Sequence, residues 1–306
     1  MRKAFAKSLL EIMDLERENK KNDTYLITGD LGFSVFEPIK ERHPDKFINA
    51  GISEQNMIGV SAGLALAGKK VFVYSIIPFL LYRPFEQVRN DICYHNLPVR
   101  LIGVGAGLAY SDAGSTHLPF EDLKVADAIP NLTILSPSDP KEVEMFMKHL
   151  EDFKKPVYMR LAKNEPNIEH GKYSSIKIGK ALRLRDGDKI LIVSTGIMTR
   201  AAMALADMLD NDGGSVEVME IHTLKPFDYP AIVSAAEGKS LVVTIEDSTG
   251  ALFDKVASSI TGIDSKVLKF SLPDEFVHIS GSRDYLLDRY GLTAEKMYEK
   301  IKEVIA

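Results

Sequence analysis

The sequence contains a single cysteine, Cys93, among its 306 residues. No disulfide framework can therefore form, and a reducing compartment such as the cytoplasm is expected. No run of 18 uninterrupted apolar residues occurs, so a membrane-spanning helix is not expected. The net charge of −5 lacks the basic excess of a nucleic-acid-binding protein. Residues 1–20 place apolar side chains at helical spacing among many charges, which predicts an amphipathic helix rather than a signal peptide.

Several short motifs of catalysis and cofactor binding are missing as well. No predicted strand is followed by G-x-G-x-x-G, and there is no P-loop, no C-x-x-C pair and no H-E-x-x-H. The segment GIMTR, residues 196–200, lacks the serine of a nucleophile elbow. The seven histidines are scattered singly, so a metal site built by this chain alone is not expected.

Short runs rich in β-branched residues alternate with helix-length stretches almost from end to end. This alternation predicts an α/β fold with parallel sheets flanked by helices, arranged as two doubly wound domains. Predicted helices include Glu54–Ala67 and Phe79–Tyr94. The predicted strands are residues 24–29, 46–51, 70–75, 99–105, 132–137 and 156–161, followed by 190–196, 215–223, 240–248 and 266–272.

A polar, turn-rich stretch interrupts the alternation near the middle of the chain. It carries Pro166, Gly171 and Gly179, and it leaves room for a small hairpin. We therefore expect a first domain over residues 1–165, a linker over 166–179 and a smaller second domain over 180–306.

Open parallel sheets bind ligands at the carboxyl ends of their strands, where three loops of the first domain fall. These loops have the sequences ITGDLGFS, NAGISEQN and GVGAGLAYSDAGSTHLPFED, and their glycines permit tight turns and close ligand approach. Glu54, in the second loop, has two interpretations. Ser53 could cap the following helix, with Glu54 complementing the helix dipole, or Glu54 could serve catalysis.

Three further features of the first domain are equally ambiguous when each is taken alone. His117 in a Gly/Ser loop could be an ordinary loop residue. The stripe of Phe79, Tyr82 and Phe85, spaced i, i+3 and i+6, is more often core than a cofactor surface. Arg160, at the end of a predicted strand, could pair with any acidic residue.

Five motifs in order give these residues a common context. They are GDLG, GISEQNMIGVSAGLALAGKKVFVYS, PFLLYRPFEQVRND, GLAYSDAGSTHLPFEDLKVADAIPNLTILSPSD and PVYMRLAKNEP. This series resembles the pyrimidine-binding domain of transketolase and of 1-deoxyxylulose-5-phosphate synthase. The second half, with IHTLKPFD and TIEDS, is similar to their C-terminal domain, so the resemblance covers essentially the whole chain.

The resemblance implies thiamine diphosphate as the cofactor. Glu54 then shares a proton with N1′ of the aminopyrimidine, which lets the cofactor lose its C2 proton and attack a ketose carbonyl. Phe79, Tyr82 and Phe85 match the aromatic pocket around the pyrimidine, with Tyr82 as the stacking ring. Asp30 and Leu31 of the GDLG motif are further cofactor-binding candidates, and His117 matches a histidine that faces the donor ketose.

The resemblance also assigns substrate contacts. Arg2, Ser34 and Arg160 match positions that hold the substrate phosphate, a role suited to the fork of donors on arginine. The family sequence DGPTH is AGSTH here, with Ala113 in place of an aspartate, and Asp112 is the candidate to compensate. Gly105 and Ala106 replace a phosphate-facing histidine of transketolase and an arginine of the synthase, which points to an unusual donor or acceptor.

One half of the family's active site has no counterpart in this sequence. The relatives hold Mg²⁺ and the diphosphate with GDG followed some 25 residues later by Asn, and the nearest segment, RDGDK, has Lys189 in place of the second glycine. We therefore expect the C-terminal (β) subunit of a two-chain transketolase that transfers a two-carbon ketol unit between a ketose phosphate and an aldose phosphate. A separate N-terminal subunit would ligate Mg²⁺, and an α₂β₂ complex is expected by analogy.

Three alternatives stay open at this point. The chain could belong to an acyloin-forming enzyme of the synthase type that uses pyruvate. It could be the β subunit of a 2-oxo-acid dehydrogenase, although THLPFED lacks the H-S-Q sequence common there. It could also be a non-catalytic regulatory subunit, a role that would not need Glu54 or the aromatic pocket.

Overall fold

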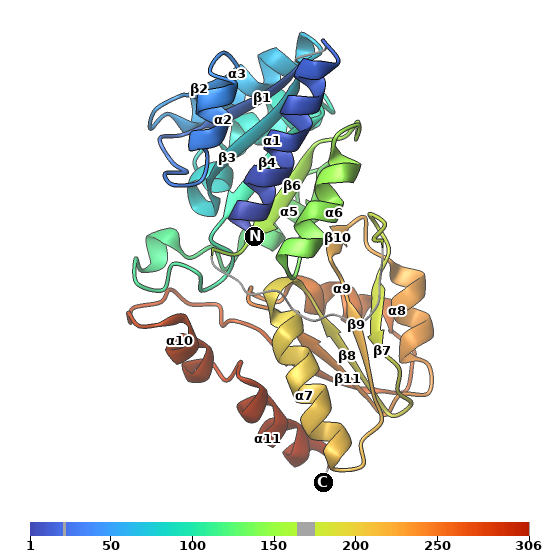
Figure 1. Ribbon diagram of the computed structural model, residues 1–306. Coiled ribbons are helices and arrows are strands. Elements are labelled where there is room, and N and C mark those ends of the chain that lie inside the picture. The colour runs from blue at the N-terminus through green and yellow to red at the C-terminus, as the bar shows by residue number, and fades with distance from the viewer. Residues whose placement is uncertain (21–22, 164–174, 306) are drawn as a thin grey trace.

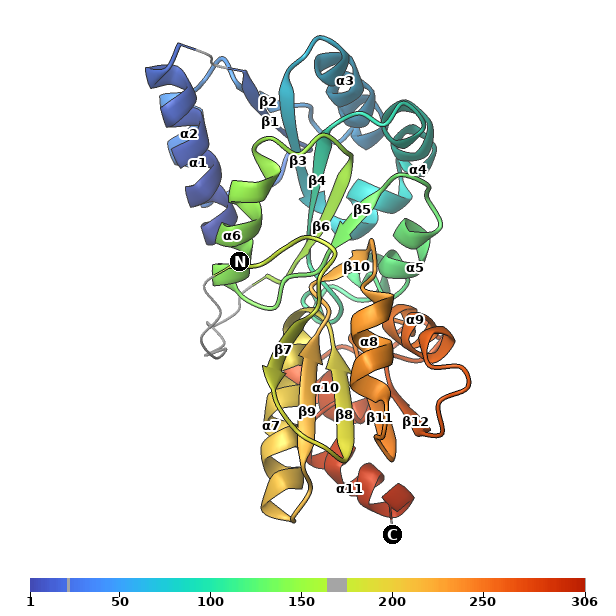
Figure 2. The ribbon, with the colours of Figure 1, turned by 90° about the vertical axis from the view of Figure 1, so that its right-hand side faces the viewer.

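The computed structural model describes residues 1–20, 23–163 and 175–305, which form two α/β domains stacked end to end (Figure 1). Each domain has a sheet dominated by parallel strands with helices on both faces, which confirms the predicted fold class (Figure 2). Among the described residues, no helix is both long enough and apolar enough to cross a membrane.

The first sheet contains seven strands in the order β10-β5-β6-β4-β3-β1-β2. The six strands predicted in the first half are all present, and the pairs among them are parallel. Helices cover both faces of the sheet, which explains why its central strands are buried almost without interruption. The six strands are β1 (Thr24–Thr28), β2 (Phe47–Asn49), β3 (Lys70–Ile76), β4 (Val99–Val104), β5 (Thr133–Leu135) and β6 (Val157–Leu161).

The predicted amphipathic helix at the N-terminus is present as α1 (Arg2–Glu18). It buries Phe5, Leu9 and Ile12, one turn apart, and packs against α6 (Pro140–Leu150) on one face of the sheet. The opposite face is covered by α3 and its neighbours (Figure 2). The other helices of this domain are α2 (Glu37–Arg42), α3 (Glu54–Leu66), α4 (Phe85–Gln87) and α5 (Asp122–Asp127).

The helix predicted over Phe79–Tyr94 is broken into three pieces, so the prediction of one helix is wrong. A π-helix, η1 (Pro78–Tyr82), is followed by the single turn α4 and by a second π-helix, η2 (Val88–Tyr94). Pro84 lies at the break, where it has no N–H to continue the ladder of hydrogen bonds. The wider π turns change the angular spacing of the aromatic side chains along this segment.

The second sheet contains five strands in the order β12-β11-β8-β9-β7. Helix α7 lies on one of its faces, with α11 beside it, and α8 and α9 lie on the other (Figure 2). The strands are β7 (Leu182–Arg185), β8 (Ile190–Ser194), β9 (Val216–Glu220), β11 (Leu241–Ile245) and β12 (Lys266–Phe270). The helices are α7 (Thr199–Asn211), α8 (Tyr229–Ala236), α9 (Ala251–Ser259), α10 (Arg283–Arg289) and α11 (Ala294–Ile305).

The segment between the domains is only partly described. Most of the predicted linker, residues 166–179, lies outside the described residues, so its boundaries stay a prediction. Just beyond it, β7 pairs antiparallel with β9 and forms an edge of the second sheet. The polar run around residues 182–185 is therefore an edge strand of the second domain.

One strand crosses from the second half of the chain into the first sheet. The single strand predicted over residues 215–223 is divided into β9 in the second sheet and β10 (Thr223–Lys225), which pairs antiparallel with β5 in the first. Lys225 extends this connection, because its ammonium donates to the carbonyls of Asp127 and Ile129 at 2.7 and 2.8 Å. The two sheets are thus joined through main-chain hydrogen bonds as well as side chains.

A buried acidic pair also lies at this domain junction. Glu142, in the first turn of α6, accepts a hydrogen bond from the Ser138 N–H at 2.8 Å, and its charge interacts with that of Glu220, at the end of β9. Burial raises the pKa of Glu142 to about 7 and that of Glu220 well above its usual range. Burial and the repulsion between the two carboxylates therefore both favour a protonated form at this place between the domains.

This pair predicts a loss of stability on the alkaline side. A carboxyl group with a raised folded-state pKa stabilises the fold below its unfolded pKa of 4.5, and this contribution is lost as the pH rises through about 7. The substitution Glu142→Gln keeps an acceptor for the Ser138 N–H and removes the titrating group. We expect it to lessen the decline in unfolding free energy from about pH 5 to about pH 8, by roughly 1–3 kcal/mol.

Urea unfolding of both proteins across this range measures the effect. Glu144→Gln, on the same helix and outside the pair, is the matched control. Burial lowers the pKa of His222 to about 4, so this residue makes the unfolding free energy rise with pH on the acid side. Its contribution is the same in wild type and variant and cancels in their difference. Parallel pH curves for wild type and Glu142→Gln would contradict the raised pKa of Glu142.

Candidate active site

The carboxyl ends of β1, β3, β4 and β6 lie along one edge of the first sheet, because these neighbouring strands are parallel. The loops singled out in the sequence leave the sheet at this edge. The chain continues from β1 into the GDLG loop and from β3 into η1. From β4 it continues into the long loop over residues 105–121. The topology therefore gathers these loops where ligands bind in open α/β sheets.

Glu54 is the first residue of α3, and only 5% of it is exposed. The capping interpretation of its neighbour is wrong, because the Ser53 hydroxyl donates to the Ala50 carbonyl at 2.6 Å and makes no cap. The surroundings of Glu54 are also not purely apolar. Its Oε1 accepts a hydrogen bond from Nη1 of Arg83 at 3.0 Å, which forms an ion pair.

The aromatic stripe, called the aromatic wall below, contacts this ion pair through Phe79. Phe79 and Tyr82 lie on η1 and Phe85 opens α4, and all three side chains are half-buried. The guanidinium of Arg83 stacks 4.1 Å from the centre of the Phe79 ring. The Tyr82 hydroxyl donates to Glu121 at 3.2 Å, and burial raises the pKa of Tyr82, so it stays protonated.

His117 joins the same wall from the long loop after β4. It ends a short 3₁₀ turn, η3 (Ser115–His117), and its ring meets the edge of Phe79 at 5.1 Å between centroids. Tyr110 lies on another side at 6.2 Å, and the Thr116 hydroxyl is 2.9 Å from Nδ1 of His117. Glu54 thus contacts Arg83, Arg83 stacks on Phe79, and Phe79 meets His117, so one series of contacts links Glu54 to His117.

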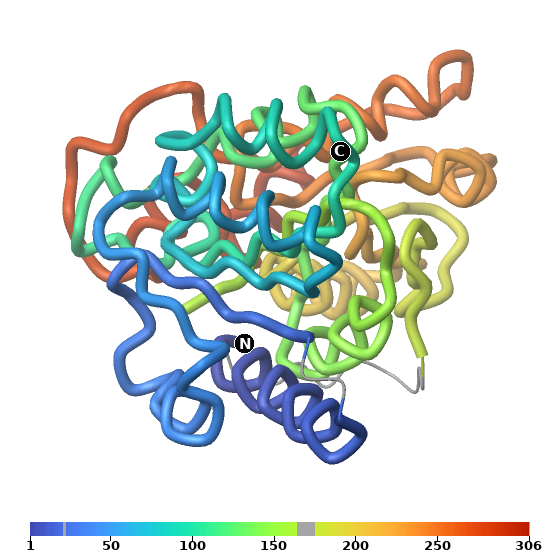
Figure 3. The backbone as a smooth tube through the Cα atoms, turned by 90° about the horizontal axis from the view of Figure 1, so that it is seen from above, coloured from blue at the N-terminus to red at the C-terminus, as the bar shows by residue number. Residues whose placement is uncertain are grey.

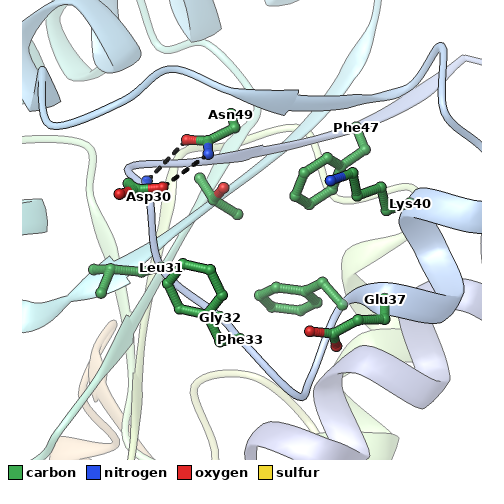
Figure 4. A pocket seen from close by; sticks show the side chains of 10 residues that line it. Asp30, Leu31, Gly32, Phe33, Glu37, Lys40, Phe47 and Asn49 are labelled. Carbon is green, nitrogen blue, oxygen red and sulfur yellow. Dashed lines mark hydrogen bonds between the residues drawn. The ribbon is translucent and has the colours of Figure 1, made fainter.

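Asp30 and Leu31 lie in the GDLG loop, which lines a cavity of about 120 Å³ (Figure 4). Asp30 has a φ of +56° and pairs with Asn49. The Asp30 N–H donates to the Asn49 side chain at 2.9 Å, and the Asn49 amide donates back at 3.1 Å. Ser34 is exposed with a φ of +61°, and its N–H donates to Glu37 at 2.6 Å. Both strained positions are fixed by these local hydrogen bonds.

Arg160 lies near the end of β6, as the sequence predicts, but its side chain is buried. Its side chain is 1% exposed, so its guanidinium does not reach a substrate phosphate in this structure. Its Nε donates to Asp122 at 2.8 Å and its Nη1 to Asp247 at 2.7 Å, which links the two domains. Burial disfavours the charge on Arg160, but the two carboxylates outweigh this penalty and raise its pKa. Burial raises the pKa of Asp122.

The two remaining substrate candidates lie at the domain junction. Arg2 donates from Nε to the carbonyl of Lys163 at 3.1 Å, just beyond β6. Asp112 is exposed and lines a different cavity from Asp30, together with Lys163 and Arg283. The described residues contain no group of three or more His, Cys, Asp or Glu side chains arranged to hold a metal ion.

Three cationic residues near these loops were missed from the sequence. Arg83 had a detectable signal, since it lies four residues after Phe79 and next to Tyr82. Lys163 lies two residues after β6. Because ligands bind at the carboxyl ends of parallel strands, Lys163 could have been predicted as a ligand-binding residue in place of Arg160. Arg283 had no such signal, because it comes from the second domain.

The two domains match two known families, in the order in which the domains occur along the chain. Residues 1–167 match the family described as "Transketolase, pyrimidine binding domain". Residues 179–297 match "Transketolase, C-terminal domain". The chain belongs to the transketolase family. The transketolase fold thus accounts for both sheets and for the edge where the loops gather.

Relatives in this family include separate subunits of similar length. The putative transketolase C-terminal section of Methanocaldococcus jannaschii is 33% identical, with 99% of this chain and 95% of that protein covered. One subunit of the apulose-4-phosphate transketolase of Phocaeicola vulgatus is 32% identical, with 99% and 97% covered. The 1-deoxy-D-xylulose-5-phosphate synthase of Dictyoglomus thermophilum is 31% identical over 98% of this chain, but only 48% of the synthase is covered.

A solved structure has the same two-domain extent. It is a split-gene transketolase in an inactive β4 tetramer, which matches with a TM-score of 0.85 and 31% identity over 99% of this chain and 96% of that one. The transketolase of Leishmania mexicana matches with a TM-score of 0.82 over 45% of its own length, and its 20% identity supports the fold alone.

The buried position of Arg160 predicts a structural effect of its loss. We expect Arg160→Met to lower the free energy of unfolding by about 3–5 kcal/mol, because Asp122 and Asp247 would then be buried without their cation. Urea unfolding of the chain measures this loss, with the exposed Arg200→Met as the matched control. A loss no larger than that of the control would show that the triad does not stabilise the domain junction.

Proposed function

We propose that this chain is the C-terminal (β) subunit of a two-chain, thiamine diphosphate-dependent transketolase that transfers a two-carbon ketol unit from a ketose phosphate to an aldose phosphate. The observation that carries the proposal is the buried Glu54 carboxylate, which is linked through Arg83 to the Phe79 ring at the ligand-binding edge of the sheet. A carboxylate and a stacking ring are the groups that a protonatable aminopyrimidine requires. The site therefore fits this part of the cofactor.

Each residue of the wall has a role in this proposal. Thiamine diphosphate, when bound, supplies the carbon nucleophile for a ketose carbonyl. Glu54 would hold a proton against the pyrimidine N1′, Tyr82 would stack on the ring, and Phe79 and Phe85 would keep water away. His117, reaching the wall through Phe79, would exchange protons with the sugar near its carbonyl.

Arg83 has a role in the unliganded chain. A carboxylate with 5% exposure needs a partner, and Arg83 provides one from a side chain that is 49% exposed. An aminopyrimidine arriving at Glu54 would displace Arg83 toward solvent. The ion pair thus satisfies the charge of Glu54 until the cofactor takes its place.

The proposal of a partner is supported by the names of relatives that are matched nearly in full. This chain covers 95% and 97% of two relatives named as a section or subunit of transketolase, but 48% of a single-chain synthase. We propose that Mg²⁺ and the diphosphate are held by a separate N-terminal subunit, and that two copies of each chain assemble as α₂β₂.

Helix α3 offers a surface for this partner. It buries Met57 and Ile58 against the sheet, yet its outer face also carries apolar side chains, with Leu66 69% and Val60 38% exposed. Gly59 and Gly63 on the same face leave open space above the backbone. A helix that is apolar on all sides is usually covered on all sides, so we assign the outer face of α3 to the N-terminal subunit.

A second candidate is an acyloin-forming reaction of the synthase type. It is favoured by the 31% identity to a 1-deoxy-D-xylulose-5-phosphate synthase. It is also favoured by Gly105 and Ala113, which stand in place of the histidine and the aspartate expected from the resemblance to contact the sugar phosphate. Product analysis separates the two reactions, because pyruvate loses carbon dioxide in the second and a ketose phosphate loses an aldose phosphate in the first.

Glu54 provides the test of catalysis. In the assembled two-chain enzyme, we expect Glu54→Gln to lower kcat by about 10²–10⁴-fold, because an amide cannot hold the proton at N1′. Turnover of ketose phosphate is measured beside Glu41→Gln, an exposed glutamate on α2. Assembly is checked by size-exclusion chromatography. Activity within twofold of wild type in an assembled variant would favour a regulatory role.

Leu66 provides a separate test of assembly. We expect Leu66→Glu to weaken the affinity for the N-terminal chain by tenfold or more, because it places a charge in an apolar contact, while the thermal stability of the free chain changes little. Calorimetric titration of one chain with the other gives the affinity. Leu15→Glu, a 57% exposed leucine on α1, is the matched control. Equal affinities for the two variants would move the interface elsewhere.

A further inference from the structure

A second cavity lies where the two domains meet, and its role is not assigned by the site described above. It has a volume of about 340 Å³ and is lined by Ser111 and Asp112 from the loop after β4, by Lys163 after β6, and by Ser282 and Arg283 at the start of α10. Both domains therefore contribute polar side chains to one space. Three of the residues follow strands whose carboxyl ends form the ligand-binding edge.

The segment that brings Arg283 to this cavity is anchored to the loop of His117. The Ser115 hydroxyl donates to the carbonyl of Val277 at 2.6 Å, and the N–H of Leu272 donates to the carbonyl of Ser248 at 3.0 Å. From the same loop, Leu118 and Phe120 are buried in the hydrophobic core of the second domain. Figures 1 and 3 show the red segment of the second domain beside the green loop of the first.

The charge in this cavity is predominantly positive. Among the described residues, no carboxylate lies within ion-pair distance of the Lys163 ammonium, which is 4.4 Å from the centre of the Tyr110 ring. Nη2 of Arg283 lies 4.0 Å from Asp247, at the limit of an ion pair, and Asp247 already binds Arg160. Asp112 is the single carboxylate among the lining residues that the structure describes, and it is exposed.

Arg283 also has a buried donor without an acceptor. Its Nε is shielded from solvent and makes no hydrogen bond within the described part of the chain. A buried, unsatisfied N–H on a charged group costs free energy, and an anionic ligand would recover it. The Ser282 hydroxyl accepts from the Tyr285 N–H at 3.1 Å and keeps its own proton to donate.

We propose that this cavity is a phosphate-binding subsite in which Arg283, from the second domain, and Lys163, from the first, hold the phosphate group of the sugar substrate. The claim that the ligand is a sugar rests on the proposed function, whereas the claim that the cavity binds phosphate does not. Arg283 supplies its Nε–H and one Nη donor, Lys163 supplies a second positive charge, and the serine hydroxyls supply neutral donors. Asp112 accepts from a sugar hydroxyl beside the phosphate.

The first experiment measures binding without any need for activity. The full chain is titrated calorimetrically with inorganic phosphate against sodium chloride of equal ionic strength. We expect Arg283→Gln to weaken phosphate binding about tenfold or more, and Arg283→Lys to recover part of it by restoring the charge. The matched control is Arg200→Gln, an exposed arginine on α7 of the same domain. Thermal unfolding without phosphate shows that each variant is folded.

The second experiment identifies the source of the phosphate. In the assembled two-chain enzyme, the ratio of kcat/KM for a ketose phosphate to that for the same unphosphorylated ketose should fall about tenfold in Arg283→Gln. The ratio should be unchanged in Arg200→Gln. If phosphate binding weakens while this ratio stays constant, the subsite is real and its ligand is free phosphate.

Two results would overturn the proposal. One is an absence of phosphate binding by the wild-type chain, and the other is equal phosphate affinity in wild type and Arg283→Gln. An assembled enzyme without transferase activity would count against the proposed function alone, because the binding experiment would still decide on the subsite.

Discussion

The buried guanidinium of Arg160 fixes how the two domains of this transketolase-family chain meet. It lies at the carboxyl end of the first sheet, between Asp122 of the first domain and Asp247 of the second. Removing charges from water is costly, so all three groups must keep their geometry to satisfy one another. This requirement makes the domain junction a defined surface, and the candidate site is built along it.

The loop of residues 105–121 depends most on this junction. It begins in the first sheet after β4, buries Leu118 and Phe120 in the core of the second domain, and returns as α5, where Asp122 meets Arg160. His117 is therefore held from both sides, by the aromatic wall and by the second domain. Gly107 allows the close packing, since a Cβ there would lie 2.1 Å from the carboxylate of Asp247.

Much of this arrangement could be predicted from the sequence because its signals are local. Alternating strand and helix patterns gave all six strands predicted in the first half and the start of α3 at Glu54. Features that depend on residues far away along the chain could not be predicted. Arg160 ends a strand as a ligand-binding residue would, yet two acidic residues 38 and 87 positions away along the chain bury it. The division of β9 from β10 likewise depends on β5.

The same distinction explains why Arg83, the partner of Glu54, was not predicted. The apolar sequence after Glu54 describes the body of α3, but the carboxylate faces the following helical segment, which carries Arg83. Arg83 reaches it because Pro84 breaks the helix predicted there and the π turn before it shifts the side chains. A carboxylate buried at the ligand-binding edge needs a partner, because an unpaired buried charge is costly. Arg83 supplies it from a half-exposed side chain that stacks on Phe79, so the charge of Glu54 is satisfied without a cation buried in the core.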